Sequence, residues 1–185
     1  MKTIFFDTEF DNFANLGLIS IGFYSECGNY SLYLENINFN LNNCSDFVKQ
    51  IVIPKLNLTK YGGDLEENRL KFKNWINTIP DNEILFLADY LGDIQIFWNN
   101  FYFFKQVKKI IAQHIHQRLE YLFQEKNLNI IQQNNFINIF NQQLQLKEKE
   151  EKENLHHALF DAKMNTLCWN YSWTKLMESN DATHV

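Results

Sequence analysis

The chain has 185 residues, of which 45% are hydrophobic and 21% charged, a balance that is ordinary for one soluble globular domain. Its net charge of −5 argues against a protein that coats duplex nucleic acid with a broad basic surface, although an acidic site can bind a phosphodiester through cations. Three cysteines, far apart and without a CxxC pair, support neither a zinc knuckle nor a disulfide framework and favour a reducing interior. No segment suits a membrane span or a signal peptide, so we expect a cytoplasmic protein.

The first part of the chain predicts an antiparallel meander of three strands. Residues 2–10, 16–24 and 30–34 are runs of β character, and Gly28-Asn29 suits a tight turn before the third run. The apolar residues in these runs indicate that the strands are buried.

The remainder of the chain alternates helices with strands. Helices are expected at 46–53, 66–79, 94–104, 114–126 and 155–177, and strands at 83–89 and 107–112. Residues 127–153, which are rich in Asn and Gln and end in a charge run, are expected to form an accessory helical insertion within a single domain spanning 1–185. This order predicts an α/β fold with a mixed five-stranded sheet, whose first three strands are antiparallel, flanked by helices.

Two carboxylates interrupt the first predicted strand, which reads IFFDTEF from residue 4. Alternate side chains of a strand point to the same face, so Asp7 and Glu9 emerge together. Two buried carboxylates repel each other and resist desolvation, and a divalent metal such as Mg²⁺ or Mn²⁺ would offset that cost. The alternative is a strand that runs into solvent and exposes both acids.

Further acids occur at two informative places downstream. Asp89 and Asp93 follow the predicted strand at 83–89, and Asp161 interrupts an apolar stretch of the last helix. Because ligands in open α/β sheets gather at the carboxyl ends of strands, the first two acidic groups are expected to converge. Three acidic groups in such positions favour a shared site.

These three motifs resemble those of the DEDD 3′–5′ exonucleases of the ribonuclease H-like superfamily, in their His-containing subgroup. The matching residues are Asp7-Thr8-Glu9, Asp89 through Asp93, and His156-His157-Ala158-Leu159-Phe160-Asp161-Ala162. The opening, FFDTEF followed by LISIG, is especially similar to small bacterial and phage 3′–5′ exoribonucleases. The resemblance runs from residue 1 to about 177, excluding 127–153. The chain departs from the pattern at Asp89, where the family often has Asn. Which of Asp89 and Asp93 is the metal ligand therefore stays open.

The resemblance implies a ribonuclease H-like fold and a two-metal site. It implies that Asp7, Glu9, Asp93 and Asp161 are catalytic residues that hold two Mg²⁺ or Mn²⁺ ions. The spacing within the family selects His156 as the general base that accepts a proton from the attacking water. A regular helix would instead place His157, four residues before Asp161, on the face of that acid, so His157 is the alternative.

The resemblance also implies an activity. We expect a metal-dependent 3′–5′ exonuclease that acts on single-stranded or 3′-overhanging nucleic acid, with RNA preferred over DNA, and that releases nucleoside 5′-monophosphates. The alternatives are a DNA-preferring exonuclease and a nuclease-like module that binds nucleic acid with little or no catalysis. The protein is expected not to associate with membranes, and a homodimer is possible because related small exoribonucleases are often dimeric.

Residues beside the first motif are expected to contact the substrate. Similar enzymes implicate Thr8 and Phe10, and Asp89 is a further substrate-binding candidate; an aromatic ring such as Phe10 or Phe13 could stack on the terminal base, although Phe10 could equally belong to the core. A basic patch for the trailing phosphates is expected at Lys105, Lys108, Lys109 and Arg118. Core positions are expected for Trp75, Trp98, Trp169 and Trp173, and no role for His114, His116 and His184.

Overall fold

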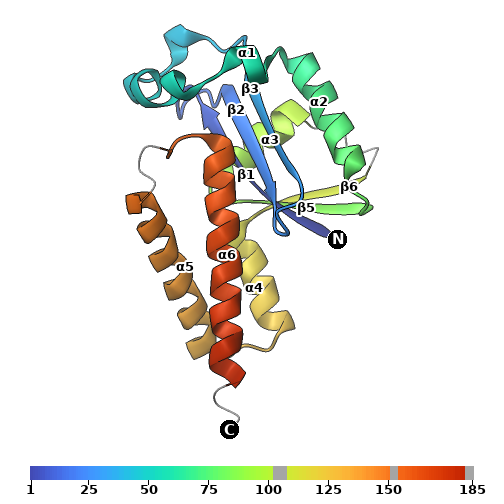
Figure 1. The fold of residues 1–185 in the computed structure, drawn as a ribbon, viewed down its shortest axis with the longest axis vertical. Coiled ribbons are helices and arrows are strands. Elements are labelled where there is room, and N and C mark those ends of the chain that lie inside the picture. The colour runs from blue at the N-terminus through green and yellow to red at the C-terminus, as the bar shows by residue number, and fades with distance from the viewer. Residues whose placement is uncertain (102–107, 151–153, 182–185) are drawn as a thin grey trace.

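The computed structural model describes residues 1–101, 108–150 and 154–181, and its centre is a mixed sheet with helices packed on both faces (Figure 1). The strands lie in the order β4-β3-β2-β1-β5-β6. Their bounds are β1 Lys2–Phe10, β2 Leu18–Ser25, β3 Ser31–Asn36, β4 Gly62–Gly63, β5 Glu83–Ala88 and β6 Lys109–His114. The first three strands are antiparallel neighbours, and β1, β5 and β6 run parallel, so the predicted α/β class with a mixed sheet is confirmed.

The sheet has six strands rather than the five predicted, because Gly62–Gly63 forms a short edge strand where the sequence predicted none. The register pairs Glu35 with Gly62 and Asn36 with Gly63. Two glycines carry no side chains that could show the alternation of a strand, so only the backbone pairing reveals β4.

Helices form in the segments predicted at 66–79, 94–104, 114–126 and 155–177 and in the insertion, and a further short helix at Leu58–Tyr61 was not predicted. The helices are α1 Leu58–Tyr61, α2 Leu65–Thr78, α3 Leu91–Phe101, α4 Ile115–Glu125, α5 Ile130–Glu150 and α6 Ala158–Asp181. The predicted helix at 46–53 is instead a π turn over Val48–Val52 followed by a 3₁₀ turn over Ile53–Lys55, whose Pro54 prevents a regular continuation. The last helix begins three residues later than predicted, and residues 102–104 of the third lie outside the described residues.

Two apolar cores lie on opposite faces of the sheet. Along β1, Ile4 and Phe6 pack into the core under α2 and α3, whereas Phe5 packs into the core formed with α4, α5 and α6. The first core is rich in phenylalanine, and the Phe97 ring lies 5.3 Å from that of Phe6. The four tryptophans pack in or against these cores, as predicted, with Trp169 almost fully buried in the second.

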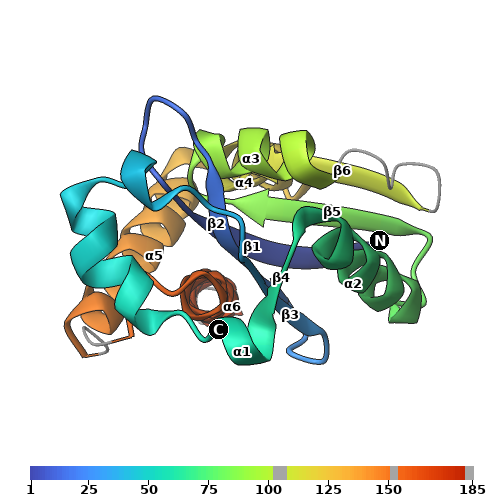
Figure 2. The ribbon, with the colours of Figure 1, turned by 90° about the horizontal axis from the view of Figure 1, so that it is seen from above.

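Helix α5 occupies most of the segment predicted to be an accessory insertion, and it lies alongside α6 (Figures 1 and 2). Phe136 of α5 is fully buried, and its ring lies 4.6 Å from that of Trp173 of α6. These contacts make α5 part of the second core; its accessory nature stays a prediction. Within the described residues, no helix is long and apolar enough to cross a membrane.

Candidate metal centre

The acids of the first two motifs meet because β1 and β5 are parallel neighbours. The register runs from Lys2 opposite Ile84 to Phe5 opposite Leu87, so the carboxyl ends of both strands lie at one edge of the sheet. Asp7 and Glu9 occupy the end of β1. Asp89 directly follows β5, and Asp93 lies in the first turn of α3.

The third acid reaches this edge because α6 begins directly on the sheet. Gly22 of β2 pairs with Asp7, and a Cβ atom on Gly22 would lie 2.1 Å from the backbone nitrogen of Leu159. No larger residue would leave room for the helix. This close approach brings Asp161, in the first turn of α6, to the face of the sheet from which Asp7 and Glu9 project.

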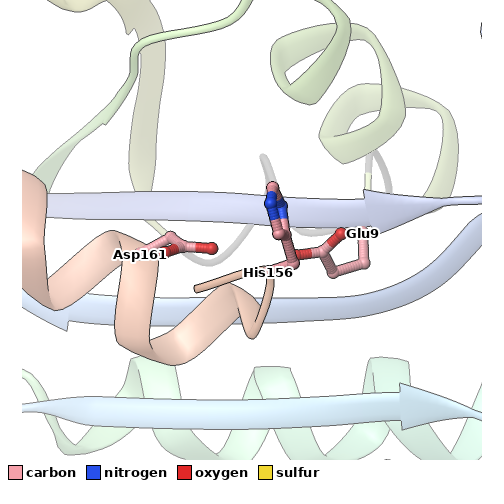
Figure 3. Close-up of side chains that lie close together, drawn as sticks. All are labelled: Glu9, His156 and Asp161. Atoms are coloured by element: carbon pink, nitrogen blue, oxygen red, sulfur yellow. The ribbon is translucent and has the colours of Figure 1, made fainter. Parts of the chain in front are cut away.

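Six potential ligands therefore gather in two groups of three. An oxygen each from Asp7, Asp89 and Asp93 lie within 4.8 Å of one another, and so do a ring nitrogen of His156 and an oxygen each of Glu9 and Asp161. In Figure 3 the His156 ring stands between the carboxylates of Asp161 and Glu9. All six residues line one open cavity of about 740 Å³.

The electrostatics of the cavity reflect an excess of buried negative charge. Burial first, and then repulsion by Asp93 and Glu9, raise the pKa of Asp7 well above its ordinary value. Burial and the charges of Asp161 and Asp93 raise the pKa of Glu9 to about 8, and burial is the main cause that raises the pKa of Asp93 and Asp161 to about 7. Carboxylates in such surroundings are stabilised in their charged form by a cation.

Asp93 has a buried carboxylate oxygen that no hydrogen bond from the described part of the chain satisfies. The residue is only 1% exposed, and its Oδ2 atom is buried without a hydrogen-bond partner among the described residues. Its other oxygen accepts a hydrogen bond of 2.5 Å from the Thr8 hydroxyl. Thr8 therefore fixes the orientation of Asp93, while its predicted contact with a substrate stays a prediction. A buried carboxylate oxygen without a partner is costly, and a metal ion would satisfy it.

The two adjacent histidines have different surroundings. His156 has a positive φ of 61°, lines the acidic cavity and lies edge-on to Phe47, with ring centroids 4.8 Å apart. Burial, then the charge of Lys55, lowers the pKa of His156, so its ring is neutral and able to accept a proton near pH 7. His157 instead stacks on Tyr33 at 4.3 Å and lines a different cavity. Of the two histidines, His156 is the one that lines the acidic cavity.

A cluster of aromatic rings borders the acids. Phe10 stacks on Tyr90 at 6.0 Å, and Phe13 meets the Phe10 ring edge-on at 5.3 Å. Phe13 is 79% exposed, which is unusual for a large apolar side chain near a polar site. Sequence reasoning missed Tyr90 and Phe47 as cavity residues; the position of Tyr90 between Asp89 and Asp93 was the available signal, whereas nothing local marked Phe47.

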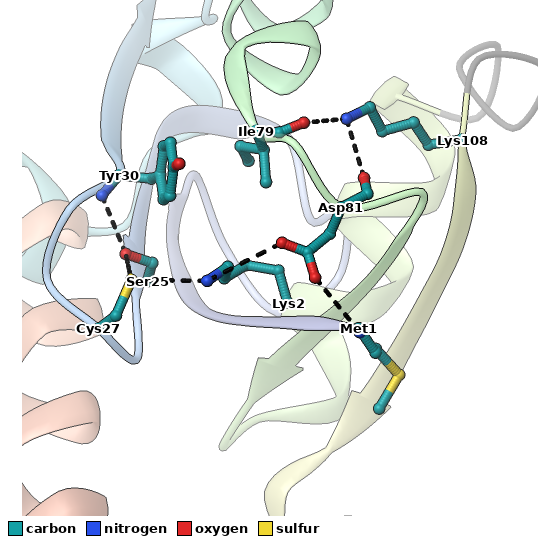
Figure 4. Close-up of polar contacts among 8 residues, drawn as sticks. All are labelled: Met1, Lys2, Ser25, Cys27, Tyr30, Ile79, Asp81 and Lys108. Carbon is teal, nitrogen blue, oxygen red and sulfur yellow. Dashed lines mark hydrogen bonds and ion pairs between the residues drawn. The ribbon is translucent and has the colours of Figure 1, made fainter.

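The three described residues of the predicted basic patch do not line the acidic cavity. Lys109 starts β6 and pairs with Glu83, so it lies at the end of the sheet opposite the acids. Lys108 donates hydrogen bonds to the carbonyl oxygens of Ile79 and Asp81 (Figure 4). Arg118 lines a separate cavity between α4 and α6, and Lys105 lies outside the described residues. For Lys108, Lys109 and Arg118 the prediction was wrong, because it grouped the residues by their proximity in the sequence. Lys108 and Lys109 lie where β6 begins, and the acids lie at the opposite end of the neighbouring strand β5.

Comparison with protein-family models and with curated proteins finds no match for this chain. The chemical argument therefore depends on the arrangement of its side chains. That arrangement is a solvent-accessible cavity with five carboxylates, one neutral imidazole and a rim of aromatic rings. Oxygen-rich sites of this kind suit hard divalent cations, and aromatic rims suit planar ligands such as nucleobases.

Proposed function

We propose that the protein is a metal-dependent 3′–5′ exonuclease of the ribonuclease H-like type, which acts on single-stranded or 3′-overhanging nucleic acid and prefers RNA. The observation that carries the proposal is the convergence of ligands from three separate parts of the chain in one cavity, including the orphaned Oδ2 atom of Asp93. The mixed sheet with antiparallel first strands agrees with the fold that the motif resemblance implies.

The residues present fit a pair of divalent ions. Asp7, Glu9, Asp93 and Asp161 would hold them, and the position of Asp89 within the first group of ligands makes it a further candidate. Two bound Mg²⁺ or Mn²⁺ ions would supply an activated water and would neutralise charge on the scissile phosphate. Hard cations suit this set because five of its six donors are carboxylates.

The remaining roles belong to residues around the acids. His156 accepts the proton of the attacking water at its unprotonated ring nitrogen. Thr8 holds Asp93 through its hydroxyl, which leaves the Oδ2 atom directed at the site. Phe10 supports the terminal base through its ring, together with Phe13 and Tyr90. Hydrolysis would release nucleoside 5′-monophosphates.

The test is incubation of the protein with 5′-labelled RNA and DNA oligonucleotides in Mg²⁺, Mn²⁺ or chelator. We expect a ladder that shortens from the 3′ end, faster on RNA, and no products with chelator. An Asp7→Asn variant with an unchanged circular dichroism spectrum serves as the control for contaminating nuclease and should be inactive. Binding without shortening would indicate a nucleic-acid-binding module, and faster degradation of DNA would indicate a DNA-preferring enzyme.

A further inference from the structure

Lys55 has an environment that is unusual for a lysine in this chain. It ends the 3₁₀ turn Ile53–Lys55 and is half-buried. Its ammonium group donates a hydrogen bond to the carbonyl oxygen of Leu155, and no carboxylate among the described residues lies within ion-pair distance of it. An ammonium group has three donors, so one carbonyl oxygen leaves a half-buried positive charge incompletely satisfied.

Lys55 lies beside the metal centre. The carbonyl oxygen that accepts the hydrogen bond from Lys55 belongs to Leu155, and Leu155 lines one cavity together with Asp7, His156 and Asp161. No lysine or arginine is among the described residues that line the acidic cavity itself. Lys55 is therefore well placed to offer a positive charge at the edge of that cavity.

The surroundings of Lys55 leave space for an anion. Lys55, Asn154, His157 and Phe160 line a cavity of about 390 Å³. This cavity is adjacent to the acidic cavity, because His156 lines the acidic cavity and His157, the next residue, lines the cavity beside Lys55. A nucleic-acid strand whose scissile phosphate lies at the acids and whose path continues past His156 and His157 would bring the neighbouring phosphate to the ammonium group of Lys55.

We propose that Lys55 binds a backbone phosphate of the nucleic-acid strand next to the scissile one; this inference rests on the function proposed above. Carboxylates repel phosphates, so only the scissile phosphate can approach them through cations, and a neighbouring phosphate needs a positive charge from the protein. The rival role for Lys55 is structural, in which its bond to Leu155 only holds the turn that carries His156.

The salt dependence of binding separates these two roles. Each phosphate contact on a single strand contributes about 0.7 to the slope of log affinity against log salt concentration. We would measure this slope by fluorescence anisotropy with labelled RNA and Mn²⁺, and all proteins would carry Asp161→Asn to prevent hydrolysis. Lys55→Gln should reduce the steepness of this slope by about 0.7, because glutamine has no charge. Glutamine keeps a donor for the carbonyl oxygen of Leu155, so the structural contact is retained. Lys55→Arg should restore the slope.

A matched control and a substrate series locate the contact. Lys60, whose ammonium group lies over the Tyr61 ring at 4.7 Å, is the control, and Lys60→Gln should leave the slope unchanged. Oligonucleotides with one neutral methylphosphonate linkage should bind the parent protein more weakly when the linkage replaces the phosphate next to the scissile one. Lys55→Gln should abolish that sensitivity at this linkage alone.

Three results would overturn the inference. If the slope of log affinity against log salt concentration were unchanged in Lys55→Gln, whether or not binding became weaker, Lys55 would have only a structural role. Methylphosphonate sensitivity that persists in Lys55→Gln would assign the phosphate to another residue. The third result concerns the proposed function itself. If the Asp161→Asn protein bound no RNA or DNA and the unsubstituted protein shortened neither, the proposed function would fail, and the phosphate contact with it.

Discussion

The two halves of β1 are buried to a similar extent, yet their surroundings have opposite character. Ile4, Phe5 and Phe6 are fully buried and contact apolar side chains on both faces of the sheet. Thr8 and Glu9, a few residues on, are 4% and 9% exposed, but Glu9 faces other carboxylates. One half of the strand lowers the free energy of the fold, whereas the other half concentrates repulsion between carboxylates, which protonation or a bound cation would relieve.

The largest effect is expected from a change at an acid that faces the acidic half of β1. Asp161→Asn removes one ligand and one charge, and we expect nucleotide release to fall by about a thousandfold or more because a bound ion contributes several kcal/mol to the transition state. Single-turnover assays with labelled RNA would measure the loss. Activity close to that of the parent protein would show that Asp161 holds no ion.

A change in the core that packs against the apolar half of β1 should have the reverse outcome. Phe97 packs against Phe6 and Phe86 at ring distances of 5.3 and 5.0 Å and is fully buried. Phe97→Ala should cost about 3–5 kcal/mol of unfolding free energy, as the cavity cannot fully collapse. Urea denaturation would measure the cost, and the rate per folded molecule should stay unchanged. A large loss of rate in the folded variant would mean that the two halves are coupled.

The pH dependence of stability sharpens the comparison. Burial raises the pKa of Asp93 and Asp161 to about 7, and that of Glu9 to about 8. The folded, metal-free protein thus binds protons that the unfolded chain releases near pH 4, so this contribution to stability is complete below about pH 4 and is lost as the pH rises through 7 and 8.

We therefore expect the Tm in chelator to fall between pH 6 and pH 8.5, by about 2–4 °C for each kcal/mol lost, and Mn²⁺ to restore it. Asp161→Asn should show a smaller fall, because one of the titrating groups is absent. A Tm that is independent of pH in this range would show that folding does not raise the pKa values of these acids.

The smallest effect is expected at Thr8, which lies between Asp7 and Glu9 in the acidic half of β1. Thr8→Val removes the donor to Asp93 while keeping the shape of the side chain. Burial raises the pKa of Asp93 and the Thr8 hydroxyl lowers it, so the substitution should raise it further. Mn²⁺ affinity, measured by calorimetry, should fall by about tenfold at pH 6.5 and by less at pH 8.5. Thr3→Val, at the other end of β1, is the control, and an equal loss at both pH values would contradict the account.

The fold could be predicted from the sequence where side chains carried a periodic signal. The alternation in β1 placed Asp7 and Glu9 on one face, and the apolar runs located the strands that β1 pairs with. The edge strand Gly62–Gly63 could not be predicted, because it is defined only by backbone pairing.

The candidate site was predictable where its residues lie at the ends of strands, and less so elsewhere. Spacing alone could not decide between His156 and His157, since a positive φ at His156 takes it out of the regular helical series. The contributions of Phe47 and Lys55 come from irregular turns, whose path depends on tertiary contacts such as the bond from Lys55 to Leu155.

The central claim is that the acids converge on a shared pair of cations, and an electron paramagnetic resonance titration with Mn²⁺ at pH 8 tests it most directly. The account predicts two ions bound per chain, with at least one lost in each of Asp7→Asn and Asp161→Asn. Absence of bound Mn²⁺ in the parent protein, or full binding in both variants, would contradict it.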